Sequence, residues 1–168
     1  MFENTKELKR TKAELEKALK VKITIKDKEV TIEGNPVDEY EADIVLRAIG
    51  LGFSAKKALL LKDEGMIFRK INIKDYTRRK NLSEIKARLI GTEGKTKKTI
   101  EEISNTDIVI KNNEVGLIGE AESIDNATTA IINLIRGSKQ ANVYRYLEEK
   151  NRIMKEEDLG LKETQNKK

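Results

Sequence analysis

Two glycines three positions apart, Gly91 and Gly94, are the residues of this sequence best suited to holding a phosphate group. Glycine has no Cβ atom, so its backbone can turn tightly and approach a ligand closely. Lys95 follows directly, and with Lys97 and Lys98 it opens a segment of helical spacing. The first N–H groups and the positive dipole end of such a helix favour an anion. The pattern therefore predicts a backbone clamp for phosphates between two helices.

Apolar side chains flank this glycine loop, Gly91–Gly94. Ile90 precedes the loop, Ile100 lies in the segment after it, and a short alternating strand contains Ile108 and Ile110. Positive charge for phosphates beside an apolar surface for bases is what single-stranded nucleic acid requires. The alternative is that these isoleucines are only core residues and that the loop is a tight helix–helix turn without a ligand.

The net charge of the chain is concentrated around the loop. The formal net charge is +5, whereas the stretch from Arg78 to Lys98 alone contains eight basic and two acidic residues. A local excess of positive charge favours a polyanionic ligand. A lysine-rich surface that is simply exposed to solvent is the alternative interpretation.

The composition argues against an enzyme. The chain has no cysteine and no histidine, which excludes disulfides, thiolate nucleophiles, the usual zinc sites and the commonest general base. The glycine loop lacks the four-residue spacer and the Gly-Lys-Ser/Thr of a nucleotide-binding P-loop. We therefore expect no catalytic residue, no cofactor and no metal. The apolar runs are too short to cross a membrane and the N-terminus has no signal-peptide pattern, which favours a cytoplasmic protein without membrane contact.

Hydrophobic periodicity predicts an α+β fold. Pro36 is expected to open a helix that ends near Gly50 or Gly52. The tail after Glu156 is polar and is expected to fray. The other helices are predicted at residues 4–20, 54–61, 83–90, 95–104, 122–135 and 143–154, and the strands at 21–25, 29–32, 66–73, 107–111 and 115–118.

An internal repeat underlies this order of elements. A shift of 85 positions aligns the two halves without a gap and places Ile23 on Ile108 and Ile25 on Ile110. The chain therefore contains two copies of one unit. In the first copy, Lys6–Lys9 stands where the second has its glycine loop, and only five residues precede it. Without glycine there is no backbone clamp, so we assign the first copy to structure or to protein contacts.

These residues resemble the archaeal Dim-two, or Partner of Nob One, family of KH-domain proteins, which is related to the Krr proteins. The resemblance rests on Arg88–Lys97, Ile100-Glu101, Ile118-Gly119, Gly137-Ser138 and Val143-Tyr144. It implies two tandem KH-like units of type I, each a three-stranded antiparallel sheet packed with helices, the first degenerate or truncated, followed by a C-terminal helix. The domains expected are 1–65 for the degenerate first unit, 66–138 for the second KH domain, and 139–168 for the C-terminal helix and polar tail.

The resemblance also implies a role in small-subunit ribosome assembly. It implies binding to the 3′ region of small-subunit ribosomal RNA, positioning of the Nob endonuclease, and contact with an archaeal initiation factor subunit. Relatives often have lysine as the first residue between the glycines, where this chain has Thr92. The predicted RNA-binding residues are those of the loop, its flanks and the following strand: Lys86, Arg88, Ile90, Gly91, Thr92, Glu93, Gly94, Lys95, Lys97, Lys98, Ile108 and Ile110.

Two other roles remain open on the sequence alone. A protein-interaction scaffold with the KH fold would use Tyr144, Tyr146 and Leu147 as a partner surface, although these residues could equally dock the last helix. Another RNA-binding role, such as that of an exosome-associated protein, would usually add an S1-like barrel, for which 168 residues leave no room.

Overall fold

A computed structural model describes residues 2–165 and divides the chain into two units. The first unit takes the chain up to Ile71 together with Asp107–Ala121, and the second takes Asn72–Thr106 and the chain from Glu122 onward. Each unit is therefore built from two separate stretches of sequence. The domain boundaries expected from the repeat and the resemblance do not coincide with this division, and they stay a prediction.

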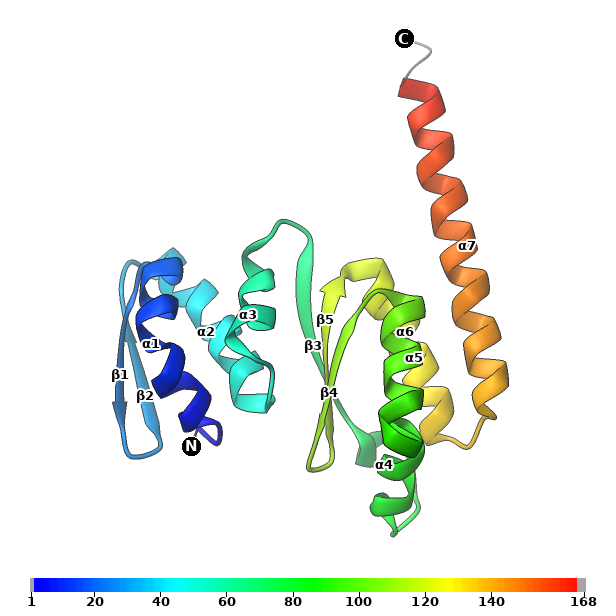
Figure 1. Ribbon diagram of the computed structural model, residues 1–168, viewed down its shortest axis with the longest axis horizontal. Coiled ribbons are helices and arrows are strands. Elements are labelled where there is room, and N and C mark those ends of the chain that lie inside the picture. Colours follow the sequence, from blue (N-terminus) through cyan, green and yellow to red (C-terminus); the bar gives the residue numbers. More distant parts are fainter. Residues whose placement is uncertain (1, 166–168) are drawn as a thin grey trace. The chain divides into compact units, whose positions relative to one another are not determined.

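The first unit contains the first copy of the repeat and the strands of the second (Figure 1). Its helices and strands lie close to the predicted positions, which confirms the α+β assignment. In chain order they are α1 (Thr5–Leu19), β1 (Lys22–Lys26), β2 (Glu29–Glu33), α2 (Pro36–Leu51), α3 (Ala55–Ala58), the 3-10 helix η1 (Leu59–Lys62), β3 (Met66–Asn72), β4 (Asp107–Lys111) and β5 (Glu114–Glu120).

The ends of α2 show why this segment is a helix. Pro36 occupies its first turn, where the missing N–H costs no hydrogen bond. The side-chain oxygen of Asn35 accepts a hydrogen bond of 2.9 Å from the backbone N–H of Asp38 and caps the helix. At the other end Gly52 has φ +127°, a conformation that favours glycine.

The two sheets differ in size. β1 and β2 form a two-stranded antiparallel sheet in which Lys22 faces Glu33 and Lys26 faces Glu29. The other sheet has the order β3-β5-β4, with β4 antiparallel to β5. The prediction of three strands in each unit is thus confirmed for the second sheet and wrong for the first. Of the described residues, 2–4 precede α1 and form no strand, so the first sheet consists of the hairpin β1-β2 alone.

A single apolar cluster joins the elements of the first unit. Phe53 lies within it, almost fully buried, and meets the ring of Phe68 edge-on with a centroid distance of 6.2 Å. Burying each large aliphatic side chain contributes about 1.5–3 kcal/mol to folding. The buried members come from α1, β1, α2, α3 and β5 and from the segments that connect them: Leu8, Leu15, Leu19, Val21, Ile23, Ala42, Val45, Leu46, Ala48, Ile49, Phe53, Ala55, Ala58 and Ile118.

The second unit consists mainly of helices (Figure 1). They are the 3-10 helix η2 (Ile73–Tyr76), α4 (Leu82–Ile90), the 3-10 helix η3 (Thr92–Gly94), α5 (Lys95–Ser104), α6 (Ala121–Ile135) and α7 (Gln140–Gln165). Val143 and Leu147 of α7 are buried, as expected of docking anchors.

The last helix is longer than predicted. The frayed tail expected after Glu156 is wrong for the described residues, because α7 continues to Gln165. Arg152 bridges Glu149 at 2.7 Å and Glu156 at 2.5 Å along one face of this helix. Such pairs three and four positions apart stabilise a helix.

Backbone conformation confirms the internal repeat. Left-handed residues recur 85 positions apart: Lys20 and Asn105 end the helices α1 and α5 with φ of 56° and 52°. Asp27 and Asn112, both with φ 54°, occupy the two hairpin turns. The two copies therefore share the same turns as well as the same order of elements.

Replacing Lys20 with glycine tests the strain at the end of α1. A left-handed conformation costs an ordinary L-residue about 1–2 kcal/mol, so Lys20→Gly is expected to raise the free energy of unfolding by about 0.5–1 kcal/mol. The control is Ala13→Gly at an exposed position inside the same helix, which should lower it by about 1 kcal/mol. Urea unfolding followed by circular dichroism measures both. Equal destabilisation by the two substitutions would contradict the argument.

Candidate nucleic-acid interface

The glycine loop is one tight turn between α4 and α5. Gly91 ends α4 with φ 76° and ψ 174°, and its N–H donates to the carbonyl of Ala87 at 2.8 Å. The N–H of Gly94 donates back to the carbonyl of Gly91 at 3.2 Å. The N–H of Lys95 donates to the carbonyl of Thr92. The first N–H groups of this helix were expected to favour an anion, but that of Lys95 is not available because the turn itself uses it.

The two glycines are required for different reasons. A Cβ atom on Gly91 would lie 2.2 Å from the Oγ1 of Thr96 and 2.7 Å from its backbone nitrogen. The start of α5 can approach the end of α4 this closely only because Gly91 has no side chain. At Gly94 no heavy atom of the described residues, apart from its two chain neighbours, lies within 4 Å of the corresponding position. Gly94 therefore leaves open space in which the backbone of a ligand could come close.

Backbone donors are available inside the turn. Among the residues that the structure describes, no acceptor is bonded to the N–H groups of Thr92 and Glu93. Glu93 has φ 54° and ψ 29° and is exposed. The start of α5 has no side-chain cap, because Gly94 occupies the cap position. Unused N–H groups at the start of a helix form a site for an anion.

The lysines of the interface differ in how much of their charge is available. Lys95 and Lys98 are exposed, and no described residue forms an ion pair with them. Lys97 is paired with Glu101, Nζ to Oε1 at 3.1 Å, one turn further along α5. Lys86 is partly exposed on α4. The two unpaired lysines therefore supply most of the positive field beside the turn.

Arg88 has a structural function that its position in the sequence did not indicate. Its Nη1 donates to the carbonyl of Leu134 at 3.0 Å, and its Nη2 donates to the carbonyl of Ser138 at 2.8 Å. The side chain thus fixes the end of α6 and the turn that follows. Both terminal nitrogens of Arg88 already donate to these carbonyls. A direct contact of Arg88 with RNA stays a prediction.

The predicted apolar residues fall into two groups. Ile90 is 37% exposed at the end of α4, directly before the glycine loop, whereas Ile100 is buried in α5. Ile108 is buried and Ile110 partly exposed on β4, which belongs to the first unit. Ile90 is therefore the apolar side chain that this unit offers next to the loop. The roles of Ile108 and Ile110 in binding stay predictions.

The first copy has a continuous helix where the second has its loop. Lys6–Lys9 lies in the first turns of α1, and Leu8 is fully buried in the core. The carboxylate of Glu7 accepts hydrogen bonds from the N–H of Ala55 at 3.2 Å and from Arg10 at 2.7 Å. This segment serves the packing of the first unit and presents no turn to a ligand.

Thr96 and Gln140 complete the turn, and sequence reasoning missed both. Thr96 is 3% exposed, and its Oγ1 accepts a hydrogen bond of 2.9 Å from the Nε2 of Gln140 at the start of α7. In the sequence Thr96 stands among lysines and looks like a surface position. One signal in the sequence could have indicated this burial. Thr96 lies five residues after Gly91, in the first turn of the next helix, which must pass close to the glycine.

Within the described residues, no group of three or more Asp, Glu, His or Cys side chains could hold a metal ion. No helix in the same part of the chain is long and apolar enough to cross a membrane.

A helix, a glycine loop and a second helix, followed by two antiparallel strands and a third helix, make up a KH domain, a class of fold that binds nucleic acid by clamping its backbone. Residues 67–152 match a family model for the second KH domain of PNO1, described as a eukaryotic type KH-domain (KH-domain type I). The chain belongs to the PNO1/Dim2 family of KH-domain proteins.

Similar sequences occur in archaea and eukaryotes. A KH domain-containing protein of Methanocaldococcus jannaschii is 34% identical over 151 residues, which cover 86% of this chain and 66% of that protein. RNA-binding protein pno1 of Drosophila melanogaster is 31% identical over 134 residues, 75% of this chain and 56% of that protein. The chain thus spans between about half and two thirds of the length of these relatives.

Solved structures share the fold. Dim2p from Pyrococcus horikoshii has a TM-score of 0.77 and 38% identity, covering 83% of this chain and 87% of its own. A complex described as a/eIF2alpha–aDim2p–rRNA from the same organism has a TM-score of 0.78 and 37% identity, covering 85% and 83%. A protein of unknown function from Aeropyrum pernix has a TM-score of 0.84 and 32% identity, covering 93% and 87%.

The different requirements at the two glycines can be measured. Gly94→Ala should lower the free energy of unfolding by about 1–2 kcal/mol, because only the left-handed backbone is strained. Gly91→Ala should lower it by clearly more, because the new methyl group also collides with the start of α5. Urea unfolding of both variants gives the comparison. Equal losses would show that the close approach of Thr96 is unimportant.

Proposed function

We propose that the protein binds single-stranded RNA through the glycine loop of its second copy and acts in small-subunit ribosome assembly. The observation that carries the proposal is the turn at Gly91–Gly94, which combines open space at Gly94 with N–H groups and two lysine side chains that no described residue engages. A turn of this kind clamps about four nucleotides. The phosphates meet the N–H groups and the lysines, and Ile90 meets a base.

Charge separates the two units and supports this location. The residues of the first unit include 16 basic and 16 acidic side chains, whereas those of the second include 18 basic and 13 acidic ones. The entire net charge of +5 therefore belongs to the unit that contains the loop. A polyanion is attracted to the second unit and not to the first.

The proposed target is the 3′ region of small-subunit ribosomal RNA. The support comes from relatives: several bear the name RNA-binding or pre-rRNA-processing protein PNO1, and a similar protein of Pyrococcus horikoshii is described in a complex with rRNA. In this proposal the protein binds the RNA but does not cleave it, so a partner must cleave the RNA. The Nob endonuclease is the proposed partner for that step.

Adding a negative charge to the turn tests the RNA clamp. Thr92→Asp places a carboxylate beside the unused N–H groups, where it competes with a phosphate, so affinity should fall at least tenfold. The matched control is Ser54→Asp, which adds the same charge at an exposed cap of α3 in the first unit and keeps the cap. Fluorescence anisotropy with a labelled oligonucleotide from the 3′ region measures both.

The unaltered protein should also show a salt dependence that reflects three or four neutralised phosphates. The expected slope of log affinity against log salt is roughly −2 to −3. A flat salt dependence, or equal losses of affinity in Thr92→Asp and Ser54→Asp, would contradict the proposed clamp. Circular dichroism spectra verify that both variants are folded.

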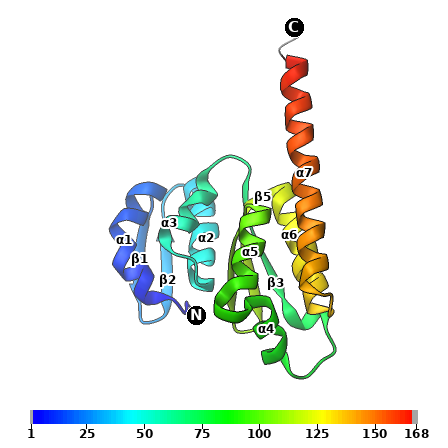
Figure 2. The same ribbon diagram turned by 45° about the vertical axis from the view of Figure 1, so that its right-hand side comes forward.

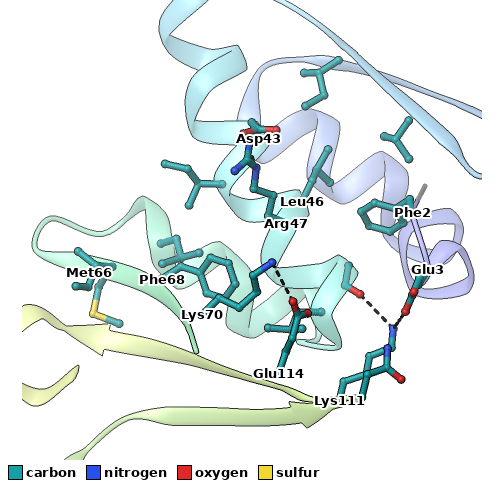
Figure 3. A pocket seen from close by; sticks show the side chains of 18 residues that line it. Phe2, Glu3, Asp43, Leu46, Arg47, Met66, Phe68, Lys70, Lys111 and Glu114 are labelled. Carbon is teal, nitrogen blue, oxygen red and sulfur yellow. Dashed lines mark hydrogen bonds and ion pairs between the residues drawn. The ribbon is translucent and has the colours of Figure 1, made fainter. Parts of the chain in front are cut away.

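Protein binding by the first unit is a second candidate function. A cavity of about 790 Å³ lies against α2, with Phe2, Leu46, Met66 and Phe68 among its apolar lining residues (Figure 3). Its charged residues neutralise one another: Lys70 pairs with Glu114 at 3.2 Å, and further pairs join Arg47 to Asp43 and Lys111 to Glu3. The hydrogen bond from Lys111 holds the pKa of the Glu3 carboxyl below its ordinary value.

The outer face of α2 extends this surface. Val37 is 68% and Tyr40 is 70% exposed, and Ile44, one turn further, lines the cavity. In the second copy of the repeat, the residues 85 positions later are Glu122, Asp125 and Thr129, all of them polar and exposed. The same helix face is thus polar in one copy and apolar in the other. Exposed apolar side chains beside a cavity favour a protein partner.

We infer that this α2 face contacts a protein, for which the Nob endonuclease and the alpha subunit of the archaeal initiation factor are the candidates. Tyr40→Asp should weaken binding to the true partner at least tenfold, because it places a charge in the centre of an apolar contact. The control is Leu159→Ser, which removes another largely exposed apolar side chain, at 61% exposure, from α7. Isothermal titration calorimetry with each purified candidate distinguishes them. Binding that is indifferent to Tyr40→Asp would place the contact elsewhere.

A further inference from the structure

The turn between α6 and α7 is held against the segment that precedes α4. The guanidinium of Arg136 lies over the ring of Tyr76, 5.8 Å from its centroid. Gly137 follows with φ +106°, and the Nη2 of Arg79 lies 4.0 Å from the position that a Cβ atom on this glycine would take. The arginines of two segments far apart in the sequence are therefore brought together.

Hydrogen bonds connect the same turn, on its other side, to the residues around the glycine loop. Arg88, in the last turn of α4, bonds the carbonyls of Leu134 and Ser138. Gln140 bonds Thr96, the residue that packs against Gly91. The α6–α7 turn thus links the segment before α4 with the loop after it, and Figure 2 shows these segments together at one end of the second unit.

Five basic residues lie in the segment before α4 and in the α6–α7 turn, and we call them the basic strip. All five are exposed, and within the described part of the chain none of them forms an ion pair. The nearest acidic residues in the sequence are Asp75 and Glu84 for Arg78–Lys80, and Asp125 and Glu148 for Arg136 and Lys139. Like charges gathered without counter-charges repel one another, so the strip lowers stability unless a polyanion covers it. Its members are Arg78, Arg79, Lys80, Arg136 and Lys139.

A purely structural reading explains only part of the strip. Arg136 and Lys139 lie at the end of α6, where cations are favourable for the helix dipole. Arg88, however, already bonds the carbonyls there. The dipole also gives no reason for three consecutive cations in Arg78–Lys80, which belong to no helix or strand. A ligand with negative charge explains both groups.

We propose that the basic strip binds the backbone of the same RNA beyond the nucleotides that the glycine loop holds. The proposal rests on the proposed RNA-binding function and extends its site. α4 has nine residues and is therefore roughly 13.5 Å long. A helical strand advances roughly 3.4 Å per nucleotide, so the two ends of α4 meet different nucleotides. Arg136 also presents a planar guanidinium on which an unstacked base can lie.

The experiment measures how affinity depends on the length of the RNA and on the charges of the basic strip. Nested single-stranded RNAs of four to twelve nucleotides from the 3′ region are titrated by fluorescence anisotropy. The strip variant Arg79→Gln/Arg136→Gln/Lys139→Gln is compared with a control variant, Lys22→Gln/Lys26→Gln/Lys56→Gln. The control removes three exposed and unpaired charges from the first unit. Circular dichroism and urea unfolding verify that both variants are folded.

The strip variant is expected to bind the shortest RNA as the unaltered protein does and to lose the gain in affinity with length. For the longest RNA the loss should be on the order of 10- to 50-fold at moderate salt, and the salt slope should become shallower by about 2. An unchanged length dependence would overturn the proposal, and so would an equal loss in the control variant. Failure of the unaltered protein to bind any of the RNAs would instead reject the RNA-binding function itself.

Discussion

The close contact between Gly91 and Thr96 is the constraint on which the candidate site depends. A Cβ atom would lie 2.2 Å from the threonine hydroxyl, so α5 can start where it does only because residue 91 is glycine. This approach folds the loop into a single turn and buries Thr96, while no described residue accepts a hydrogen bond from the N–H groups of Thr92 and Glu93. The buried hydroxyl in turn anchors Gln140 and with it the start of α7.

The repeat shows how one unit can serve two purposes. Both copies keep the same hairpin turns and the same left-handed residues at the ends of their helices. Where one copy has its glycine loop, the other has a helical turn whose Leu8 fills the core. The charges follow this division, because the net positive charge lies with the unit that has the loop. The segment that forms the glycine loop in one copy thus serves packing in the other.

Periodicity and turn chemistry are local properties, and what depends on them could be predicted from the sequence. The helices, the strands, the repeat and the glycine loop depend on such local properties and were predicted. The bonds of Arg88 to the end of α6 could not be predicted, because they join residues about 50 positions apart and arginine in a basic stretch looks like a surface residue. The length of α7 was missed because a polar segment can be helical when its charges pair along one face, as those of Arg152 do. The third strand of the first sheet was wrongly expected because the family resemblance, and not a pattern in the residues, implied it.

The assignment of β4 and β5 to the first unit has a consequence for the order in which the chain can fold. Ile118 belongs to the core that is otherwise made by the first 58 residues. During synthesis from the N-terminus this core stays incomplete until residue 118 has left the ribosome, by which time the glycine loop and α5 have also been made. The two units therefore mature together, and contacts so distant in sequence slow folding. A nascent chain of this protein exposes part of its core until the glycine loop and α5 have been made.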